Sequence, residues 1–392
     1  MKRHLRYILI MLMALPVIGF SSCIGESYPE EAPVQPEQDG KMWLHINVSS
    51  LNAASIAGDN NRDLIYSLRV IMLNDKGEVE FNQYERLSSP QTRYEFDVLA
   101  KAGEKRFYFI ANADDIDIYE PGNSNPMKEW EFFNRYPYGS TGFEDAVKEL
   151  YFENSYFDNT SYPLPYTSKY VVTTQPGKQN YEFWLVKAAT KYTVHFENSR
   201  GESVELNNLY ISQLVDKMYL MPNVSQETIS GKYWIDWLHE VSDESHLPES
   251  NQGDVDFNDK WGWLTGYRVP EAESFDLYLV KNGNVTIPGL QTAAGEEPKP
   301  GTADLGPFYS VEGMNLLEGG GGLQQYTVHL DLTDNKDNSH IEDYRILPNL
   351  SALFRNTHVI INITFDESYM HVYGQIQGWD VHDAYGKVTE EK

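Results

Sequence analysis

The chain has 392 residues and a formal net charge of −27, because 58 acidic residues outnumber 31 basic ones, and this charge disfavours nucleic acids and acidic membranes as partners. Its single cysteine cannot form an internal disulfide, so a hydrophobic core must stabilise the fold. The 27 Tyr, 17 Phe and 8 Trp favour strands while 28 Gly and 19 Pro supply turns, so the composition predicts an all-β protein.

The first 22 residues have the pattern of a secretory signal peptide. Three basic residues precede an apolar run from Tyr7 to Phe20, which is shorter than the roughly 20 residues that span a bilayer. Cys23 follows two small residues, and this arrangement resembles the lipobox of bacterial lipoproteins, in which the thiol takes a diacylglyceryl group. We therefore expect a lipid on Cys23 and a mature formal charge of 28 − 58 = −30. An ordinary signal cleavage site beside an unmodified cysteine is the alternative.

Residues 23–40 are acidic and rich in proline without hydrophobic periodicity, which is typical of a solvated tether. Alternation of apolar and polar residues begins directly after this segment. Apolar residues at every second position of Met42 to Ser49 predict the first strand, and Leu51 to Asp63 has the composition of a loop that contains Arg62.

Short alternating segments continue to residue 186 and predict antiparallel sheet. Arg106 to Asn112 is apolar on both faces, so we expect it to be a central strand that is covered on both sides. Residues 114–160 contain several prolines and glycines and predict an irregular segment, with a turn or two of helix within residues 142–149. The other expected strands are Tyr66–Met72, Val79–Phe81, Arg93–Val98, Tyr170–Thr174 and Asn180–Val186.

A second set of strands follows Lys187. We therefore expect an N-terminal β-sandwich at residues 41–187 and a C-terminal β-sandwich at residues 188–392. The hairpin of His358–Phe365 and Tyr369–Gln377 shows the clearest alternation of the whole chain. The remaining strands expected in this half are Thr190–Phe196, Val204–Leu206, Tyr210–Leu214, Tyr219–Met221, Ser274–Val280 and Gln325–Leu332.

The sequence lacks the motifs GxSxG, HExxH, GxxxxGK[ST] and CxxC, so it predicts no enzyme, no bound metal and no cofactor. The closest mature histidines, His239 and His246, are too far apart in sequence to share a metal on a helix or a strand. Asp254 to Asp259 has alternating carboxylates like the start of a calcium loop. Calcium binding there stays open, although Asp259 and Thr265 stand where such a loop needs Gly and Glu.

Five segments, in this order, resemble the FimA and Mfa fimbrillins, the type V pilins of Bacteroidales. They are Ser67–Gln83, Lys105–Asp114, Leu185–Asn198, Leu353–Phe365 and Gly374–Val381. The likeness spans nearly all of the mature chain. It implies two tandem transthyretin-like (Greek-key) β-sandwiches, export as a lipoprotein of the cell outer membrane, and assembly into a cell-surface fimbria that serves adhesion.

The resemblance also implies assembly by proteolysis. In such pilins an arginine-specific protease cuts in the loop after the first strand, that strand leaves, and β-strand addition by the next subunit fills the groove. On this chain the departing strand would be Met42 to Ser49, the cut would follow Arg62, and the donor would lie within Tyr369 to Lys392. The partners would be other pilin subunits. Whether the chain is a stalk, tip or anchor subunit stays open.

The main alternative is an uncleaved surface lipoprotein that acts as a fimbrial anchor or captures a glycan or a host protein. Its binding surfaces would be residues 114–160 and 232–263, although clustered aromatic residues more often pack inside a fold than stack on sugars. A hydrolase that uses scattered carboxylates has only the number of acidic residues in its favour. The aromatic residues considered for sugar stacking are Tyr233, Trp234, Trp237, Trp261 and Trp263.

Overall fold

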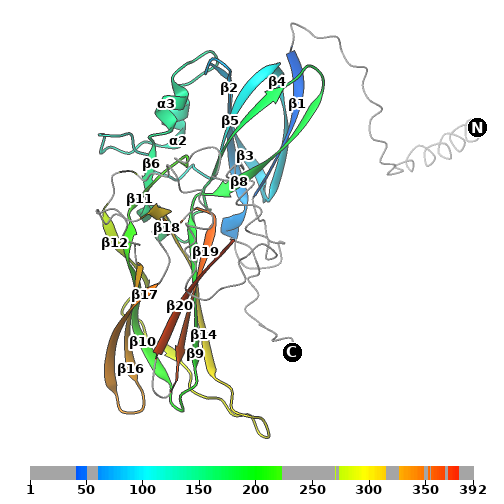
Figure 1. The fold of residues 1–392 in the computed structure, drawn as a ribbon. Helices are drawn as coiled ribbons and strands as arrows, with labels where there is room; N and C mark the ends of the chain where they lie inside the picture. The colour runs from blue at the N-terminus through cyan, green and yellow to red at the C-terminus, as the bar shows by residue number, and fades with distance from the viewer. Residues whose placement is uncertain are drawn as a thin grey trace, which may run out of the picture. The chain divides into compact units, whose positions relative to one another are not determined.

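The computed structural model describes residues 41–50, 61–222, 270, 273–314, 326–347, 352–353, 355–366 and 370–378. Nearly every regular element in these ranges is a strand, which confirms the all-β prediction (Figure 1). The described residues from Met42 onward belong to one compact unit. Within the described ranges, no helix is long and apolar enough to cross a membrane.

The N-terminal strands form one seven-stranded sheet in the order β3-β2-β5-β7-β8-β1-β4. β7 and β8 pair only at Tyr166↔Lys187 and Thr167↔Val186, so the sheet divides there into two layers. Apolar side chains of both layers meet in one core, which makes this region a β-sandwich. The strands are β1 (Lys41–Ser50), β2 (Ile65–Asn74), β3 (Val79–Gln91), β4 (Arg93–Lys101), β5 (Gly103–Ala111), β7 (Tyr166–Thr174) and β8 (Gln179–Lys187).

β5 is the central strand that its sequence predicts. It lies between β2 and β7, and Phe107 and Phe109 point into the sandwich core. Tyr108 and Ile110 belong to a second apolar cluster on the opposite face. Because both faces are covered, this strand can be apolar at every position.

Residues 114–165 cover that second face. The expected helix is present as α3 (Phe143–Val147), but the segment is less irregular than predicted, since it also forms α2 (Glu129–Phe133), β6 (Tyr151–Glu153) and η2 (Asn154–Asp158). Helices of five residues are not stable on their own, so tertiary packing determines them. The buried aromatic residues of this segment are Phe132, Phe133, Phe143, Phe152, Tyr156 and Phe157.

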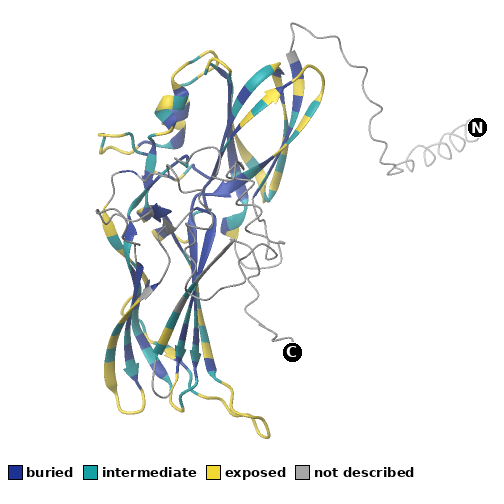
Figure 2. Cartoon of the chain, in the orientation of Figure 1, coloured by how far each residue is buried: buried dark blue, intermediate teal, exposed yellow. Residues whose placement is uncertain are grey.

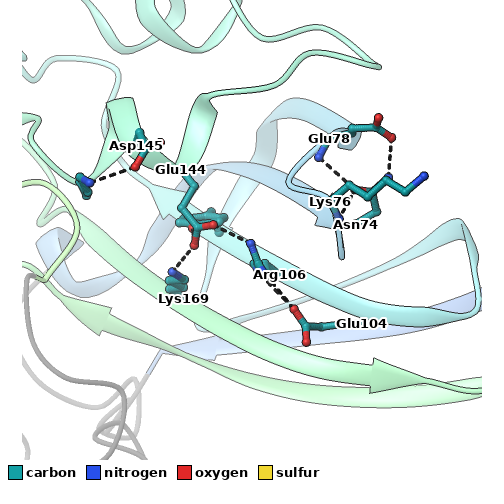
Figure 3. A network of polar contacts seen from close by, with 10 residues as sticks. Asn74, Lys76, Glu78, Glu104, Arg106, Glu144, Asp145 and Lys169 are labelled. Carbon is teal, nitrogen blue, oxygen red and sulfur yellow. Dashed lines mark hydrogen bonds and ion pairs between the residues drawn. The ribbon is translucent and has the colours of Figure 1, made fainter.

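A carboxylate at the start of α3 attaches this helix to the sheet (Figure 3). Glu144 accepts hydrogen bonds from Lys169 Nζ at 2.6 Å, Arg106 Nη1 at 2.7 Å and Tyr108 OH at 2.8 Å. Burial alone would raise the pKa of Glu144, but the hydrogen bonds and the two cations together lower it below its ordinary value. Asp145, its neighbour on α3, instead pairs with Lys148 of the same turn at 2.9 Å.

The C-terminal strands form two sheets, in the orders β14-β9-β19-β20 and β12-β10-β16-β17, with β13 paired to β10. Apolar side chains from both sheets form a single core, so this region is a second β-sandwich, as predicted. The strands are β9 (Thr190–Asn198), β10 (Val204–Val215), β12 (Ser274–Val280), β13 (Val285–Ile287), β14 (Gly301–Ser310), β16 (Tyr326–Asp334), β17 (Ser339–Leu347), β19 (Thr357–Phe365) and β20 (Met370–Gly378).

Some strands of this half differ from the prediction. The two segments expected at 204–206 and 210–214 form the single strand β10, whose alternation is interrupted by a register shift between Leu206 and Asn208 and by Gln213 at φ 69. β13, β14 and β17 were not expected. In β14 the alternation is broken around Gly306 and Pro307, where the pairing with β9 shifts register.

Apolar residues from both sides of Lys187 share the second apolar cluster, the one that contains Tyr108 and Ile110. Val215, Met218, Tyr309 and Val311 pack with the side chains of residues 114–165, and β11 (Lys217–Tyr219) pairs with β6. A two-residue pairing of β15 (Gly313–Met314) with β18 (Ala352–Leu353) completes the described strands. The domain boundary near Lys187 stays a prediction.

Candidate subunit interface

The first strand is an interior strand of the layer β8-β1-β4 (Figure 1). It runs parallel to β8, from Leu44↔Gln179 to Ser50↔Leu185. On its other side it neighbours β4, and the backbone N–H of Ser50 donates to the carbonyl of Thr92, the residue before β4, at 2.9 Å. Both edges of β1 are therefore paired with strands that come later in the chain.

The alternate residues of β1 are buried in the core of the sandwich (Figure 2). Leu44, Ile46 and Val48 have no exposed surface, and Met42 is 6% exposed. Burying a large apolar side chain contributes about 1.5–3 kcal/mol, so these four contribute about 6–12 kcal/mol together. That is comparable to the whole stability of a typical domain, about 5–15 kcal/mol. The sandwich therefore cannot lose β1 unless another strand replaces it.

The outward-facing side chains of β1 make polar contacts with β4. His45 Nδ1 lies 2.9 Å from Asp97 Oδ1, and Asn47 Nδ2 donates to Glu95 Oε1 at 3.4 Å. The pair of His45 is exposed and contributes about 0–1 kcal/mol, and the hydrogen bond of Asn47, which is 6% exposed, contributes about 1 kcal/mol. Most of the stabilisation thus comes from backbone pairing and from the apolar face, which any extended strand with the same alternation can provide.

Arg62 lies in the short 3₁₀ turn η1 (Asn61–Asp63) and is only 8% exposed. Its Nε donates to the carbonyl of Tyr162 at 2.7 Å, and its Nη2 donates to the carbonyl of Asn159 at 3.4 Å. The guanidinium carbon lies 4.8 Å from the centroid of the Tyr309 ring. Burial lowers the pKa of the Arg62 guanidinium. The expected cleavage residue is therefore held by the fold instead of projecting from an open loop.

The backbone of η1 is held as well. The carbonyl of Arg62 accepts a hydrogen bond from Leu164 N at 2.8 Å, and the carbonyl of Asp63 accepts one from the hydroxyl of Tyr166. Arg62 is also the only basic residue between Ser50 and Ile65. An arginine-specific protease acting between β1 and β2 thus has one site, and η1 must open before that site is accessible.

The predicted donor region overlaps the last described strand. β20 pairs with β19 along its whole length, from Thr357↔Gly378 to Phe365↔Met370. In the described part of the chain it has no second partner strand, so it is an edge strand of the C-terminal sandwich. Residues 370–378 could act as donor only after leaving β19, and the rest of the predicted donor region, residues 379–392, lies outside the described ranges.

Several predicted site residues lie outside the described ranges. They include the lipidation candidate Cys23, the calcium candidate Asp254 to Asp259 and the aromatic residues considered for sugar stacking. Where the structure is described, no three His, Cys, Asp or Glu side chains are placed to hold a metal ion.

Sequence reasoning missed a buried ion pair next to the predicted domain boundary. Arg355 is 1% exposed and pairs with Glu312, which is 2% exposed. The same guanidinium donates to Thr167 Oγ1 at 2.7 Å and to the carbonyls of Tyr219 at 2.7 Å and Leu220 at 3.0 Å. It therefore connects β7 of the first sandwich with elements that follow Lys187. Its sequence neighbourhood gives no sign of this role.

The chain matches no protein-family model and no curated protein. Among solved structures it is similar to the tip fimbrial protein Mfa3 of Porphyromonas gingivalis, with 12% identity, a TM-score of 0.48 and coverage of 86% of this chain and 100% of that one. It is also similar to the fimbrilin FimA of the same organism, with 11% identity, a TM-score of 0.46 and coverage of 86% and 97%. A fimbrial assembly protein of Parabacteroides distasonis is similar as well, with 10% identity, a TM-score of 0.41 and coverage of 85% of this chain and 94% of that one. These structures include fimbrillins, the family that the sequence resembles.

Proposed function

We propose that this chain is a structural, non-enzymatic subunit of a cell-surface fimbria that serves adhesion. It is exported as a lipoprotein precursor, with residues 1–22 as signal peptide, a lipid on Cys23 and residues 23–40 as a tether to the cell outer membrane. Its partners are pilin subunits of the same or a related kind. Assembly proceeds by exchange of the first strand.

The observation that carries this proposal is the place of β1 in its layer. The only covalent connection of β1 to the remainder of the sandwich is the segment of residues 51–64. In the sheet, however, β1 lies between β8 and β4. Its loss would leave a gap lined by unpaired backbone groups of both neighbours and by the core residues that it now covers. An extended segment of another subunit with apolar residues at alternate positions would pair with both edges and refill the core.

Cleavage after Arg62 is the proposed trigger. Before cleavage, β1 is covalently attached and remains in its groove, which keeps the precursor monomeric. Afterwards, the released piece contains both the lipid on Cys23 and β1, so its departure frees the body of the subunit from the membrane. The side chain of Arg62 donates to the Tyr162 carbonyl, and Leu164 and Tyr166 donate to the backbone carbonyls of η1. Cutting therefore requires local opening of this turn.

The test uses uncut full chain, purified in detergent and treated with an arginine-specific endoprotease. A cut between Arg62 and Asp63 followed by concentration-dependent growth of polymers, seen by light scattering, is the expected result. The matched control is Arg62→Gln, which should stay uncut at this bond and monomeric. Cleavage without polymer growth, even when purified native fimbriae are added as seeds, would contradict the proposal.

A further inference from the structure

Four aromatic rings cross the sheet β12-β10-β16-β17 side by side. Tyr278, Tyr210, His329 and Tyr344 each lie on a different strand, and the pairing places each ring directly opposite the next. The ring centroids are 4.9 Å apart for Tyr278 and Tyr210, 4.4 Å for Tyr210 and His329, and 6.2 Å for His329 and Tyr344. We call these four residues the aromatic stripe.

The aromatic stripe faces away from the core. Its neighbours along β10, Leu209 and Ile211, point into the core of the C-terminal sandwich. The two central rings, Tyr210 and His329, are stacked at an interplanar angle of 4°. The two outer rings are tilted from their neighbours by 32° and 33° and are the exposed ones, Tyr278 at 42% and Tyr344 at 66%. Ring surface for a ligand is therefore available at both ends of the stripe, although at Tyr278 it is reduced by Lys281, whose Nζ lies over the ring, 4.8 Å from its centroid.

Hydrogen-bonding groups lie beside the stripe, two residues further along the strands. Asp331 is paired with Asn208 and with Glu342 across the sheet, so all three share the face of the stripe. Asp331 accepts hydrogen bonds from Asn208 Nδ2 at 2.7 Å and from Asn207 Nδ2 at 3.0 Å. The carboxylate and amides are thus held in place before any ligand arrives, which reduces the entropic cost of binding.

Rings flanked by fixed carboxylates and amides suit a sugar. The C–H face of a pyranose packs on a ring, and its hydroxyls bond to carboxylate and amide groups, as expected of a site with a few placed polar groups on an apolar base. The charge on this face is mainly negative, from Asp276, Asp331 and Glu342, whereas Lys281 adds one positive charge over the Tyr278 ring and His340 Nδ1 lies 3.3 Å from Asp331 Oδ1. Acidic sugars would be repelled there.

A peptide strand added to β17 is the other occupant that this surface could take. β17 pairs only with β16 in the described part of the chain. However, Asp343 and Arg345 lie opposite the core residues Leu330 and Val328, on the inward face of β17. Inward charges on an edge strand guard it against strand addition. The observations therefore favour a sugar over a strand.

We propose that the aromatic stripe binds a neutral oligosaccharide, with Tyr278 and Tyr344 packing on sugar rings and the groups around Asp331 bonding to hydroxyls. This inference names a ligand for the adhesive part of the proposed function, and it rests on that part alone. It does not require strand exchange. Uncleaved protein is consequently the right sample, and a failure here would leave the assembly proposal standing.

The test is calorimetric titration of the uncut full chain, purified in a zwitterionic detergent, with hexasaccharides of glucose, mannose, galactose and N-acetylglucosamine, and with hexagalacturonate as the acidic counterpart. At least one neutral hexasaccharide should bind with a Kd of about 1 mM or tighter. Tyr344→Ala and Tyr278→Ala should each weaken that binding by about tenfold or more, the range of residues central to an interface. Tyr344→Phe keeps the ring and should retain most of the affinity.

The matched control is Trp43→Ala, because Trp43 is 57% exposed on β1, outside this sheet and outside the two surfaces of the alternative function. It should leave the affinity unchanged, and thermal unfolding should show that all the variants are folded. The proposal is overturned if none of the neutral hexasaccharides binds, if hexagalacturonate binds more tightly than they do, or if the double variant of Tyr278 and Tyr344 binds as the parent does.

Discussion

The guanidinium of Arg62 lies over the ring of Tyr309, 4.8 Å from its centroid, although 247 positions separate the two residues (309 − 62). Arg62 belongs to η1, which precedes β2, and Tyr309 belongs to β14 of the C-terminal sandwich. The proposed cleavage site is therefore attached to a strand that the exchange itself does not involve. Opening of η1 must break this contact.

Tyr309→Leu should accelerate cleavage after Arg62. A cation–π contact contributes about 0.5–2 kcal/mol, so its loss should increase the open population of η1, and with it the cleavage rate at limiting protease, by about 2- to 30-fold. The measurement is the initial rate of appearance of the fragment that begins at Asp63. Tyr138→Leu, a change at an exposed tyrosine, serves as the control. An unchanged rate in Tyr309→Leu would show that this contact does not restrain η1.

Two substitutions in β1 should have very different effects. Ile46→Ala removes a fully buried side chain and should lower the free energy of unfolding by about 2–5 kcal/mol. Trp43→Ala lies in the same strand, but Trp43 is 57% exposed, so the change should be within about 0.5 kcal/mol. Urea unfolding followed by fluorescence provides both values. Similar losses in the two variants would contradict the description of β1 as a strand with one buried face.

Glu144→Gln should make the stability less dependent on pH in the acid range. Because the folded protein lowers the pKa of Glu144, its carboxylate stabilises the fold above the unfolded value of 4.5, and this contribution disappears as the pH falls through the lower folded value. The difference in unfolding free energy between parent and variant should thus be largest near about pH 7 and should shrink below about pH 4.

The control for this pH series is Asp145→Asn, one residue further along α3. The Asp145 side chain is 86% exposed and pairs only within its own turn, so its substitution should change the stability little at any pH. If Glu144→Gln lost the same stability at every pH, the contribution of Glu144 would be a matter of shape and hydrogen bonding, not of charge.

Arg355→Met should be severely destabilising. It leaves Glu312 as a buried and unpaired carboxylate, which costs about 3–5 kcal/mol. Replacing both partners, with Arg355→Met and Glu312→Leu, should restore much of that loss because no buried charge remains. Arg135→Ala is the exposed control, since its side chain is 48% exposed and its pair with Glu120 should contribute about 0–1 kcal/mol. Denaturant unfolding of the variants gives the values.

Much of the fold could be predicted from local alternation. The period-two pattern of β1, β19 and β20 places their bounds within about two residues of those observed, and the apolar run of β5 correctly indicates a strand covered on both faces. Strands without clean alternation were missed or were predicted only in part. β17 carries Asp343 and Arg345 on its inward face, and β10 contains irregular positions that divide its pattern in two.

Sites that depend on long-range contacts could not be predicted. The sequence marks Arg62 as the single basic residue of its loop, but its burial depends on Tyr162 and Tyr309, which come from distant parts of the chain. The aromatic stripe likewise needs the register of four strands to bring its rings together. Local sequence patterns contain neither the register nor the packing that fixes these positions.

The N-terminus of the protein in assembled surface fimbriae, determined by mass spectrometry, distinguishes strand exchange from a permanently anchored subunit. The subunits should begin at Asp63 and lack residues 23–62, so that β1 and the lipid on Cys23 are both gone. Subunits that still begin at an acylated Cys23 within the fibre would contradict strand exchange triggered after Arg62. An anchor subunit or a free-standing surface lipoprotein would then be the better description.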